Sequence, residues 1–383
     1  MDSRIYLDHN ASTPARPEVV EAMLACLRDL HGNPSSLHRE GQRARAAVER
    51  AREQVAELVG ARPAEVVFTS GGTEGDHLGV VGAAWASGPG ARVAISGVEH
   101  HAIHGAADVL SAQGGTIDHL PVDRDGRIDA RALAIRPGTA VVAVMLANNE
   151  TGVLQPVAEV AAAAHAAGAR LHCDAVQAAG KVAVDVGALG ADTLVISGHK
   201  LGGPKGAGAL VVRSCAAVAP LFRGSGQERG RRGGTENLPG IVGLGLAAEL
   251  ARRDLGAESG RLLALRERFE AGLRGVVPDV VIHGAGVPRL PNTVNASFPG
   301  ARSDHLLMAL DSRGIAVSAG AACASGAVEP SPVLRAMNVP RELAVCAIRF
   351  SLGRTSTAAE VDDALAALAG ALAAARGMAA SPA

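Results

Sequence analysis

The fold is decided by the stretch Thr193-Leu194-Val195-Ile196-Ser197-Gly198-His199-Lys200. Its first five residues are mostly apolar or β-branched, and a run of this kind that stops at a glycine predicts a buried strand. The polar residues His199 and Lys200 therefore lie in the loop that leaves the strand. Comparable runs occur at residues 65–69, 92–96, 141–146, 170–173 and 209–213.

Segments with apolar residues at helical spacing separate these strands, at residues 17–30, 43–59, 73–86, 157–167 and 239–253. Strands that alternate with helices are typical of an α/β fold with a mostly parallel central sheet flanked by helices. Beyond a helix that runs on to about Leu273, the strands become sparser, at residues 292–298, 315–318 and 347–352. We therefore predict a large domain over residues 15–255 and a smaller α+β domain over residues 256–383, to which residues 1–14 also belong.

The charges nearly cancel, with 37 Lys and Arg against 38 Asp and Glu. This balance creates no field that attracts nucleic acid or an anionic membrane, and aromatic residues that would stack on bases are only 2% of the chain. We expect a small-molecule substrate, no direct nucleic-acid binding and no membrane segment. The N-terminal residues lack the features of a leader, and the five cysteines are scattered without paired spacing, so we expect free thiols in a cytoplasmic protein.

A glycine pair follows the first strand of the large domain, in Thr69-Ser70-Gly71-Gly72-Thr73-Glu74. It leads directly into a predicted helix, so backbone N–H groups and hydroxyls come together at the start of that helix. Such an arrangement binds anions, above all phosphate. A simple turn is the alternative interpretation, and this motif alone does not decide between the two.

Lys200 and Asp174 both come directly after predicted strands, where ligands of open α/β sheets bind. A lysine at the mouth of a sheet loses solvation, which lowers its pKa and makes it a nucleophile toward carbonyl carbon. The alternative is a solvated loop lysine. A buried Asp174 needs a cationic or donor partner, which a protonated pyridine nitrogen would supply, and the alternative role for this residue is a helix N-cap.

The order of these motifs resembles that of class V aminotransferase-like pyridoxal-phosphate enzymes of fold type I. The resemblance covers nearly the whole chain and rests on the motifs at residues 6–14, 32–36, 69–74, 99–101, 148–152, 174–177, 197–200 and 229–237. Within this group the chain is most similar to the cysteine desulfurases that supply sulfur for iron–sulfur clusters and thiolated products. The resemblance implies pyridoxal 5'-phosphate as cofactor, L-cysteine as substrate, a homodimer, and a sulfur-acceptor protein as partner.

Carried onto the matching positions, the resemblance implies that Lys200 is the Schiff-base lysine and that Asp174 is the partner of the pyridine nitrogen. It implies that His100 stacks on the ring and shuttles protons. The remaining cofactor contacts are the phosphate ligands Gly72, Thr73, Ser197 and His199, the phenolic-oxygen ligand Gln177, Asn149 near the ring, and Thr235, which would reach the phosphate of the other subunit. The basic run before Thr235, residues 229–232, is either a solvated turn or part of that subunit interface.

In the predicted small domain, residues 317–326 resemble the family's loop with the sulfur-accepting cysteine, here Cys323. Arg349 matches the arginine that binds the substrate carboxylate, to which its planar fork is suited, and Asn33 assists there. The expected reaction converts L-cysteine to L-alanine and leaves the sulfur on Cys323 as a persulfide. An acceptor in an iron–sulfur cluster or thiolation pathway then collects it.

Two residues depart from the family pattern, because Gly75 and His77 stand where Ser or Ala and then Asn are usual. They lie on the helix behind the predicted phosphate site. The cluster His100, His101 and His104 contains a pair at metal-binding spacing, but no third ligand has a recognisable spacing, and we expect no metal.

Several other functions stay open at this point. Selenocysteine lysis, transamination and epimerisation use the same scaffold, and Cys323 in its loop argues against the last two. From a different class, the chain could be a scaffold that only binds partners. Loss of Lys200, Asp174 or Cys323 would have been the mark of such a scaffold.

Overall fold

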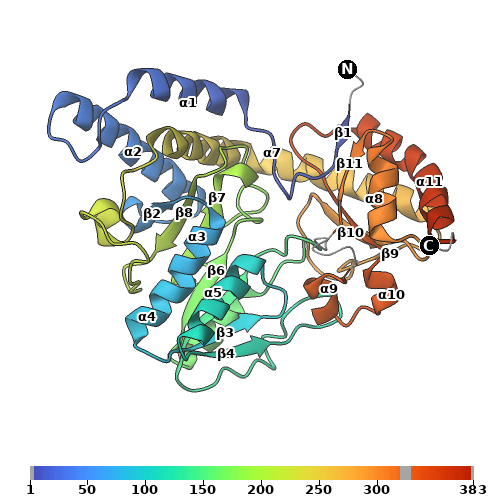
Figure 1. The fold of residues 1–383 in the computed structure, drawn as a ribbon, viewed down its shortest axis with the longest axis horizontal. Helices are drawn as coiled ribbons and strands as arrows, with labels where there is room; N and C mark the ends of the chain where they lie inside the picture. The colour runs from blue at the N-terminus through green and yellow to red at the C-terminus, as the bar shows by residue number, and fades with distance from the viewer. Residues whose placement is uncertain (1–3, 320–328, 381–383) are drawn as a thin grey trace.

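A seven-stranded sheet organises the larger lobe of the molecule (Figure 1). The computed structural model describes residues 4–319 and 329–380. The strands of this sheet are β2 (Val66–Thr69), β3 (Arg92–Ser96), β4 (Thr116–Leu120), β5 (Thr139–Met145), β6 (Arg170–Asp174), β7 (Thr193–Ser197) and β8 (Gly208–Val212). Their order across the sheet is β2-β8-β7-β6-β5-β3-β4, parallel from β7 to β4 and antiparallel where β8 pairs with β7 and β2. The predicted α/β class with a mostly parallel sheet is confirmed.

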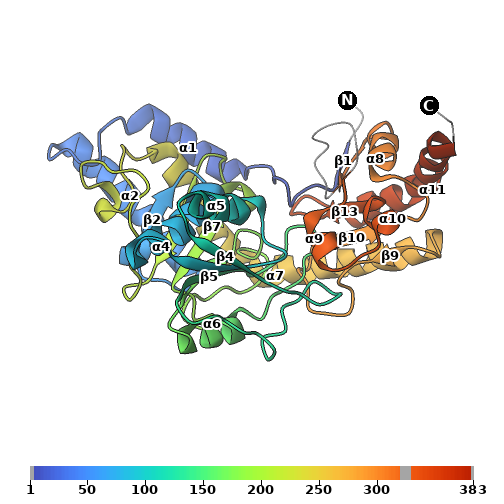
Figure 2. The same cartoon turned by 60° about the horizontal axis from the view of Figure 1, so that its bottom comes forward.

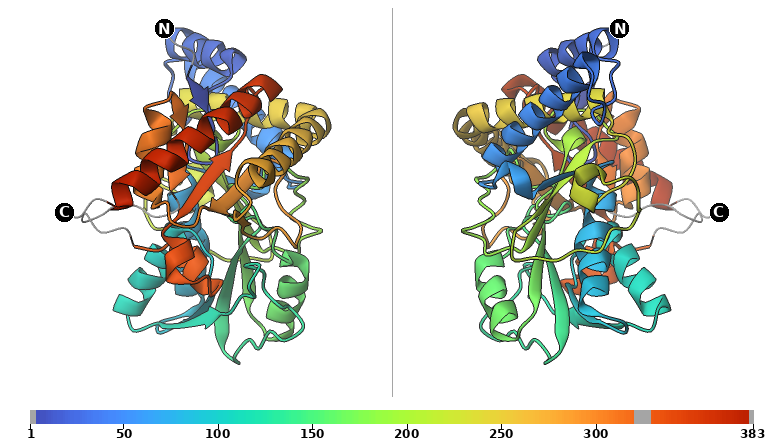
Figure 3. Two further views of the ribbon diagram at one scale, coloured as in Figure 1. Left: turned by 90° about the vertical axis from the view of Figure 1, so that its right-hand side faces the viewer. Right: turned by 90° about the vertical axis from the view of Figure 1, so that its left-hand side faces the viewer.

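Helices cover both faces of the sheet, which explains why its strands read as continuous apolar runs. Along β5, Val142 and Val144 pack in one core cluster, whereas Val141 and Ala143 pack in another on the opposite face. The helices of this lobe are α1 (Pro17–Asp29), α2 (Arg39–Leu58), α3 (Gly72–His77), α4 (Ala83–Ser87), α5 (His101–Ala112) and α6 (Val157–Ala166), with a π-helical segment η2 (Leu78–Gly82) that makes α3 and α4 continuous. In Figure 3, α5 and α6 lie on opposite sides of the strands.

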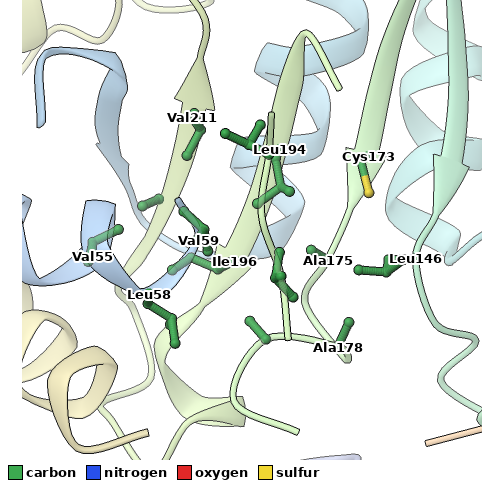
Figure 4. Packing of buried hydrophobic residues seen from close by; sticks show 14 of the residues in the cluster. Val55, Leu58, Val59, Leu146, Cys173, Ala175, Ala178, Leu194, Ile196 and Val211 are labelled. Atoms are coloured by element: carbon green, nitrogen blue, oxygen red, sulfur yellow. The ribbon is translucent and has the colours of Figure 1, made fainter. Parts of the chain in front are cut away.

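The core of the large lobe is built from aliphatic side chains, as the low aromatic content requires. Figure 4 shows Val55 of α2 and the following Val59 close to Ile196 of β7. All three are fully buried. The sheet and α2 therefore form one continuous apolar layer behind the ends of β6 and β7.

The smaller lobe contains an antiparallel sheet of order β12-β13-β10-β9 and a separate parallel pair, β1-β11. Its strands are β1 (Ile5–Tyr6), β9 (Val281–Ile282), β10 (Thr293–Ser297), β11 (Ile315–Ala316), β12 (Ser318–Ala319) and β13 (Ala347–Ser351). Its helices are α8 (Ser303–Asp311), α9 (Pro332–Ala336), α10 (Arg341–Ala344) and α11 (Ala358–Ala380). Because β1 pairs with β11, the N-terminal segment lies in this lobe, about 310 residues away in sequence from its partner strand.

One long helix, α7 (Leu238–Val276), connects the lobes (Figure 2). Leu244 in its first half packs in the core of the large lobe, and Phe269 in its second half packs in the core of the small lobe. The helix runs without a break through the predicted boundary between residues 255 and 256, so that boundary stays a prediction.

The structure contains elements that the sequence analysis did not predict, among them α5, β4 and β9. The strand β4 was not predicted, because it is a half-exposed edge strand that contains Asp118 and His119 and lacks the apolar signature of the buried strands. The single strand predicted at 315–318 is two short strands, which pair in different sheets.

Candidate active site

A cavity of about 400 Å³ lies at the carboxyl ends of the parallel strands. Residues that follow β3, β5, β6 and β7 line it, together with the start of α3 and with a side chain of β13. Ten residues predicted from the sequence meet there, namely Gly72, Thr73, His100, Asn149, Asp174, Gln177, Ser197, His199, Lys200 and Arg349. Elements of both lobes therefore form one site.

The register of the sheet explains this convergence. Asp174 at the end of β6 pairs with Met145 at the end of β5 and with Val195 near the end of β7. Because these parallel strands end at the same level, the loops that follow them leave the sheet at one edge. Residues 145–149, 174–177 and 197–200, which are separate segments of the chain, thus lie around one cavity.

Lys200 projects toward the N-terminal segment. Its Nζ donates a hydrogen bond to the backbone oxygen of Ala11 at 2.8 Å and another to the backbone oxygen of Asn10. Burial, together with the nearby positive charge of Arg349, lowers the pKa of the Lys200 ammonium to about 8, although Asp174 opposes the shift. An amine with such a pKa is partly unprotonated near neutral pH, which a carbonyl nucleophile requires.

Asp174 is buried at the end of β6, with only 6% of its surface exposed. Its Oδ1 accepts a hydrogen bond from the backbone N–H of Val176 at 2.8 Å. Burial raises the pKa of the Asp174 carboxyl to about 6, whereas the Val176 N–H and the charge of Lys200 lower it. A cationic ring nitrogen in the cavity would restore the ionised carboxylate, because an opposite charge favours it.

Asp76 also lines the cavity, behind Asp174. It is fully buried, and its Oδ1 lies 3.2 Å from Nε2 of His172, whose Nδ1 is 2.9 Å from the hydroxyl of Thr193. Burial and the neighbouring Asp174 raise the pKa of the Asp76 carboxyl, while burial lowers the pKa of His172 to about 3. Both shifts favour the uncharged form of the group concerned.

His100 is the N-cap of α5, and this fixes its ring. The Nδ1 atom accepts a hydrogen bond from the backbone N–H of Ala102 at 3.1 Å, so the neutral ring carries its proton on Nε2. Burial, reinforced by the charge of Lys200, lowers the pKa of His100 to about 4. The residue is thus a neutral imidazole with a donor on Nε2.

Arg349 reaches the cavity from β13 of the small lobe. Its Nη2 donates to Oδ1 of Asp8 at 2.7 Å, and its Nη1 donates to the backbone oxygen of Asn149 at 3.0 Å. Within residues 4–319 and 329–380, neither Nε of Arg349 nor Oδ1 of Asn149 has a hydrogen-bond partner, although both atoms are buried. Buried polar atoms of this kind call for a ligand or water.

The opposite end of the cavity is suited to an anion. Gly72 and Thr73 begin the continuous helix of α3, η2 and α4, and a Cβ at Gly72 would lie only 3.0 Å from Val176. His199 approaches Ser12, with its Nδ1 3.3 Å from the hydroxyl, and burial and Lys200 lower its pKa to about 4. Backbone N–H groups at a helix start, hydroxyls and an imidazole together match a phosphate group.

These residues fit pyridoxal 5'-phosphate. A buried carboxyl whose pKa is raised can take a ring nitrogen, an amine of lowered pKa can take the aldehyde carbon, and a helix start can take the phosphate. Asn149 and Arg349, each with a buried atom that lacks a partner among the described residues, line the same cavity.

Three predicted site residues do not line this cavity. Asn33 is exposed, and its side-chain oxygen accepts a hydrogen bond from the N–H of Ser35. Thr235 is exposed as well. The loops that carry these two residues adjoin each other, because residues from both line a second cavity of about 560 Å³. Cys323 lies outside the described residues.

Sequence reasoning missed five residues of the cavity, namely Asn10, Ala11, Asp76, Met145 and Val176. The N-terminal motif at residues 6–14 was noticed, but nothing in it indicated that backbone oxygens would face Lys200. Asn10 is buried and links three segments, since it donates to Thr293 and Asn149 and accepts from Asn292. These contacts join residues that are far apart in the sequence, so the position of Asn10 between the lobes could not be predicted from neighbouring residues.

The structure gives physical reasons for the two departures on the helix behind the phosphate site. A Cβ at Gly75 would lie 2.9 Å from a methyl group of Val195, so glycine permits close packing of α3 on β7. His77 does not line the cavity, and its Nδ1 donates to the backbone oxygen of Thr73 at 2.9 Å.

No group of three or more His, Cys, Asp or Glu residues in the described part of the chain is arranged to hold a metal ion. Among the same residues, no helix combines the length and apolar character needed to cross a membrane.

Comparison with known proteins gives one consistent result. The pattern of the family described as aminotransferase class-V matches residues 5–364. A cysteine desulfurase of Cereibacter sphaeroides is 49% identical over 94% of this chain and 93% of its own length. The cysteine desulfurase IscS of Dictyoglomus turgidum is 44% identical over 93% of this chain and 91% of its own length.

Solved structures agree with these relatives. A NifS-like protein superposes with a TM-score of 0.89 at 35% identity, over 97% of this chain and 100% of its own. A protein described as SspA in complex with cysteine superposes with a TM-score of 0.81 at 33% identity, over 91% of this chain and 99% of its own.

Proposed function

Since this chain belongs to the aminotransferase class-V family and is a pyridoxal-phosphate-dependent cysteine desulfurase, we propose that its chemistry is divided between Lys200 and Cys323. The observation that carries the proposal is the convergence of ten predicted residues on one cavity. The cofactor, when bound, supplies an electrophilic carbon for the substrate amine and a cationic ring that withdraws electrons from the α-carbon.

The cofactor-binding roles follow from the chemistry of each group. Asp174 balances the positive charge of the ring nitrogen, and the raised pKa of the nearby Asp76 disfavours a second negative charge there. Gly72, Thr73, Ser197 and His199 hold the phosphate. Gln177 and Asn149 hold the phenolic side of the ring.

Arg349 binds the carboxylate of L-cysteine. Its Nη atoms are held by Asp8 and Asn149, which fixes the plane of the guanidinium and leaves Nε without a partner in the described part of the chain. A planar fork held in this way gives the substrate one orientation. Because Lys200 lines the same cavity, a carboxylate held by Arg349 keeps the substrate within the site that contains this amine.

Protons are moved by Lys200 and His100. Lys200 as a free amine takes the α-proton and later returns one to the carbon that becomes alanine. His100 carries its proton on Nε2, so it can donate that proton before it accepts one.

Cys323 as a thiolate attacks the substrate sulfur, and the carbon–sulfur bond breaks while the sulfur–sulfur bond forms. The balance is L-cysteine plus enzyme thiol giving L-alanine plus enzyme persulfide. A sulfur-acceptor protein in an iron–sulfur or thiolation pathway of the cytoplasm then takes the outer sulfur.

The functional unit is a homodimer. Asn33 and Thr235 lie on exposed, adjoining loops away from the cavity of their own chain, which supports their acting in the site of a second copy. Arg232, next to this loop, forms an ion pair with Glu74 at 2.9 Å, so the loop is tied to the start of α3 beside the phosphate end.

The deciding experiment measures alanine and sulfide from L-cysteine with added reductant, together with the absorption spectrum. The wild type should be yellow and active, and Cys323→Ser should keep the colour and lose sulfide release. Cys215→Ser, at an exposed cysteine, is the matched control and should keep both. A yellow wild type without sulfide would mean another pyridoxal-phosphate reaction, and a colourless one would mean a partner-binding scaffold.

A further inference from the structure

Lys181 is a buried lysine that the mechanism above does not use. Only 9% of its surface is exposed, and Gln177, one helical turn earlier in the sequence, is 5% exposed. Lys181 Nζ donates to the side-chain Oε1 of Gln177 at 2.9 Å and to the backbone oxygen of the same residue at 2.9 Å. Both bonds go to Gln177, which lines the same cavity as Asp174.

The other end of the glutamine amide is also held. Gln177 Nε2 donates to the backbone oxygen of Asn10 at 2.8 Å. A flipped amide would place Oε1 against the Asn10 carbonyl, where two acceptors face each other, and would place the NH₂ group against the Lys181 amine, where donors face each other. The two contacts therefore select one orientation of the amide.

This orientation decides what Gln177 offers to a ligand. Its oxygen is engaged by Lys181, and one N–H is engaged by Asn10, so the second N–H of Nε2 is the group that remains for the cavity. A donor matches an ionised phenolic oxygen and stabilises that form, whereas an acceptor would repel it.

We propose that Lys181 is a positioning residue that locks the Gln177 amide with its donor toward the cofactor's phenolic oxygen, and thereby keeps that oxygen ionised. This inference rests on the proposed function, because it concerns the same bound cofactor. Lys181 touches Gln177 and reaches the cofactor only through it.

The lock is strongest when Lys181 is charged. Burial, followed by the charges of Lys200 and Arg349, lowers the pKa of the Lys181 ammonium to about 7. An ammonium has three N–H donors and a neutral amine has two, and the two bonds to Gln177 need only two. A neutral amine also has a lone pair that can accept from a flipped amide, so in that state the bond from Gln177 Nε2 to the Asn10 carbonyl decides the orientation.

The test is a double-mutant cycle on the cofactor-bound protein. The variants are Lys181→Met, which keeps the length of the side chain without a donor, Gln177→Ala, and the two together. The dissociation constant of pyridoxal 5'-phosphate, measured by equilibrium dialysis, should rise about tenfold for Lys181→Met in the wild-type background, as expected for one lost hydrogen bond. In the Gln177→Ala background the same change should alter it less than twofold.

The absorption spectrum supplies a readout that a purely structural role would not move. The midpoint of the pH titration of the bound cofactor's absorbance should rise by about one unit in Lys181→Met, because the ionised phenolic oxygen loses its donor. Gln177→Glu, which keeps a contact for Lys181 but presents only oxygen to the cavity, should raise it in the same way. This second variant keeps the test valid if Lys181→Met does not fold.

The inference is overturned if Lys181→Met weakens cofactor binding equally in both backgrounds, or if neither it nor Gln177→Glu moves the titration midpoint. A colourless wild type would instead refute the proposed function itself. A yellow wild type with unshifted variants refutes only the role of Lys181.

Discussion

The buried ion pair between Arg52 and Glu228 should control both the stability of the large lobe and the loop that carries Thr235. Arg52 on α2 and Glu228 are 4% and 3% exposed. Two parallel bonds of 2.8 and 2.9 Å join them. Arg52 also donates to the backbone oxygen of Val66, and Glu228 accepts from the N–H of Phe68, so the pair is tied to β2 on both sides.

We predict that Arg52→Met lowers the free energy of unfolding by about 3–5 kcal/mol, the range for removing one partner of a buried, fully bonded pair. The methionine fills the volume, so the loss reports the uncompensated charge of Glu228. The double variant Arg52→Met with Glu228→Leu should recover only part of the loss, because the N–H of Phe68 then lacks its acceptor.

The assay is urea denaturation of the cofactor-free protein at equal chain concentration, with Arg28→Met as the matched control. Arg28 forms an exposed pair with Asp29, and its removal should leave the urea midpoint unchanged. In addition, Arg52→Met should weaken cofactor binding, because Glu228 anchors the loop that leads to Thr235. A loss of stability below about 1 kcal/mol for Arg52→Met would refute the assignment of this pair as a fully buried one.

Three further predictions concern the site and its packing. Arg349→Lys keeps the positive charge but loses the planar fork of the guanidinium. The value of kcat/KM for L-cysteine should therefore fall by about 10-fold to 100-fold, while the cofactor spectrum stays unchanged. An unchanged kcat/KM would contradict carboxylate binding by Arg349. The pKa of Lys200 is lowered to about 8, and its reactive form is the neutral amine. The rate at which the cofactor-free protein recombines with pyridoxal 5'-phosphate should therefore fall as the pH is lowered from 8 to 6. A rate that does not change over this pH range, measured by stopped flow, would count against that pKa. Gly79→Ala should lower the melting temperature because the new Cβ would lie 2.2 Å from Nδ1 of buried His172. Gly256 in α7 has open space around it, so Gly256→Ala should leave the melting temperature unchanged or raise it. Equal effects of the two variants would mean that α3 and η2 can move away from the sheet.

The strands and the residues that follow them could be predicted because the information is local. Val195 and Ile196 lie in a run that reads as a buried strand, and Lys200 comes just after it, so the place of Lys200 at the sheet's edge follows from a stretch of eight residues. The same argument holds for Asp174 after β6 and for His100 after β3. The order of the motifs along the chain resembles that of a known enzyme family, and this resemblance indicated that these residues bind one cofactor.

The contacts between distant segments could not be predicted in this way. Asp8 meets Arg349 and Asn10 meets Lys200 because β1 pairs with β11 and carries the N-terminal segment to the junction of the lobes. Lys181 follows a glycine in a turn and has the sequence context of a solvated lysine, yet the fold buries it against Gln177.

The sequence by itself therefore determined the α/β class, the cofactor site at the carboxyl ends of the strands, and the family. Only the tertiary structure decided which backbone oxygens face Lys200, how the Gln177 amide is oriented, and that α7 continues between the lobes. The physical reason is that strand and helix formation depends on the periodicity of neighbouring residues, whereas burial and hydrogen-bond partners depend on which remote segments the packed core brings together.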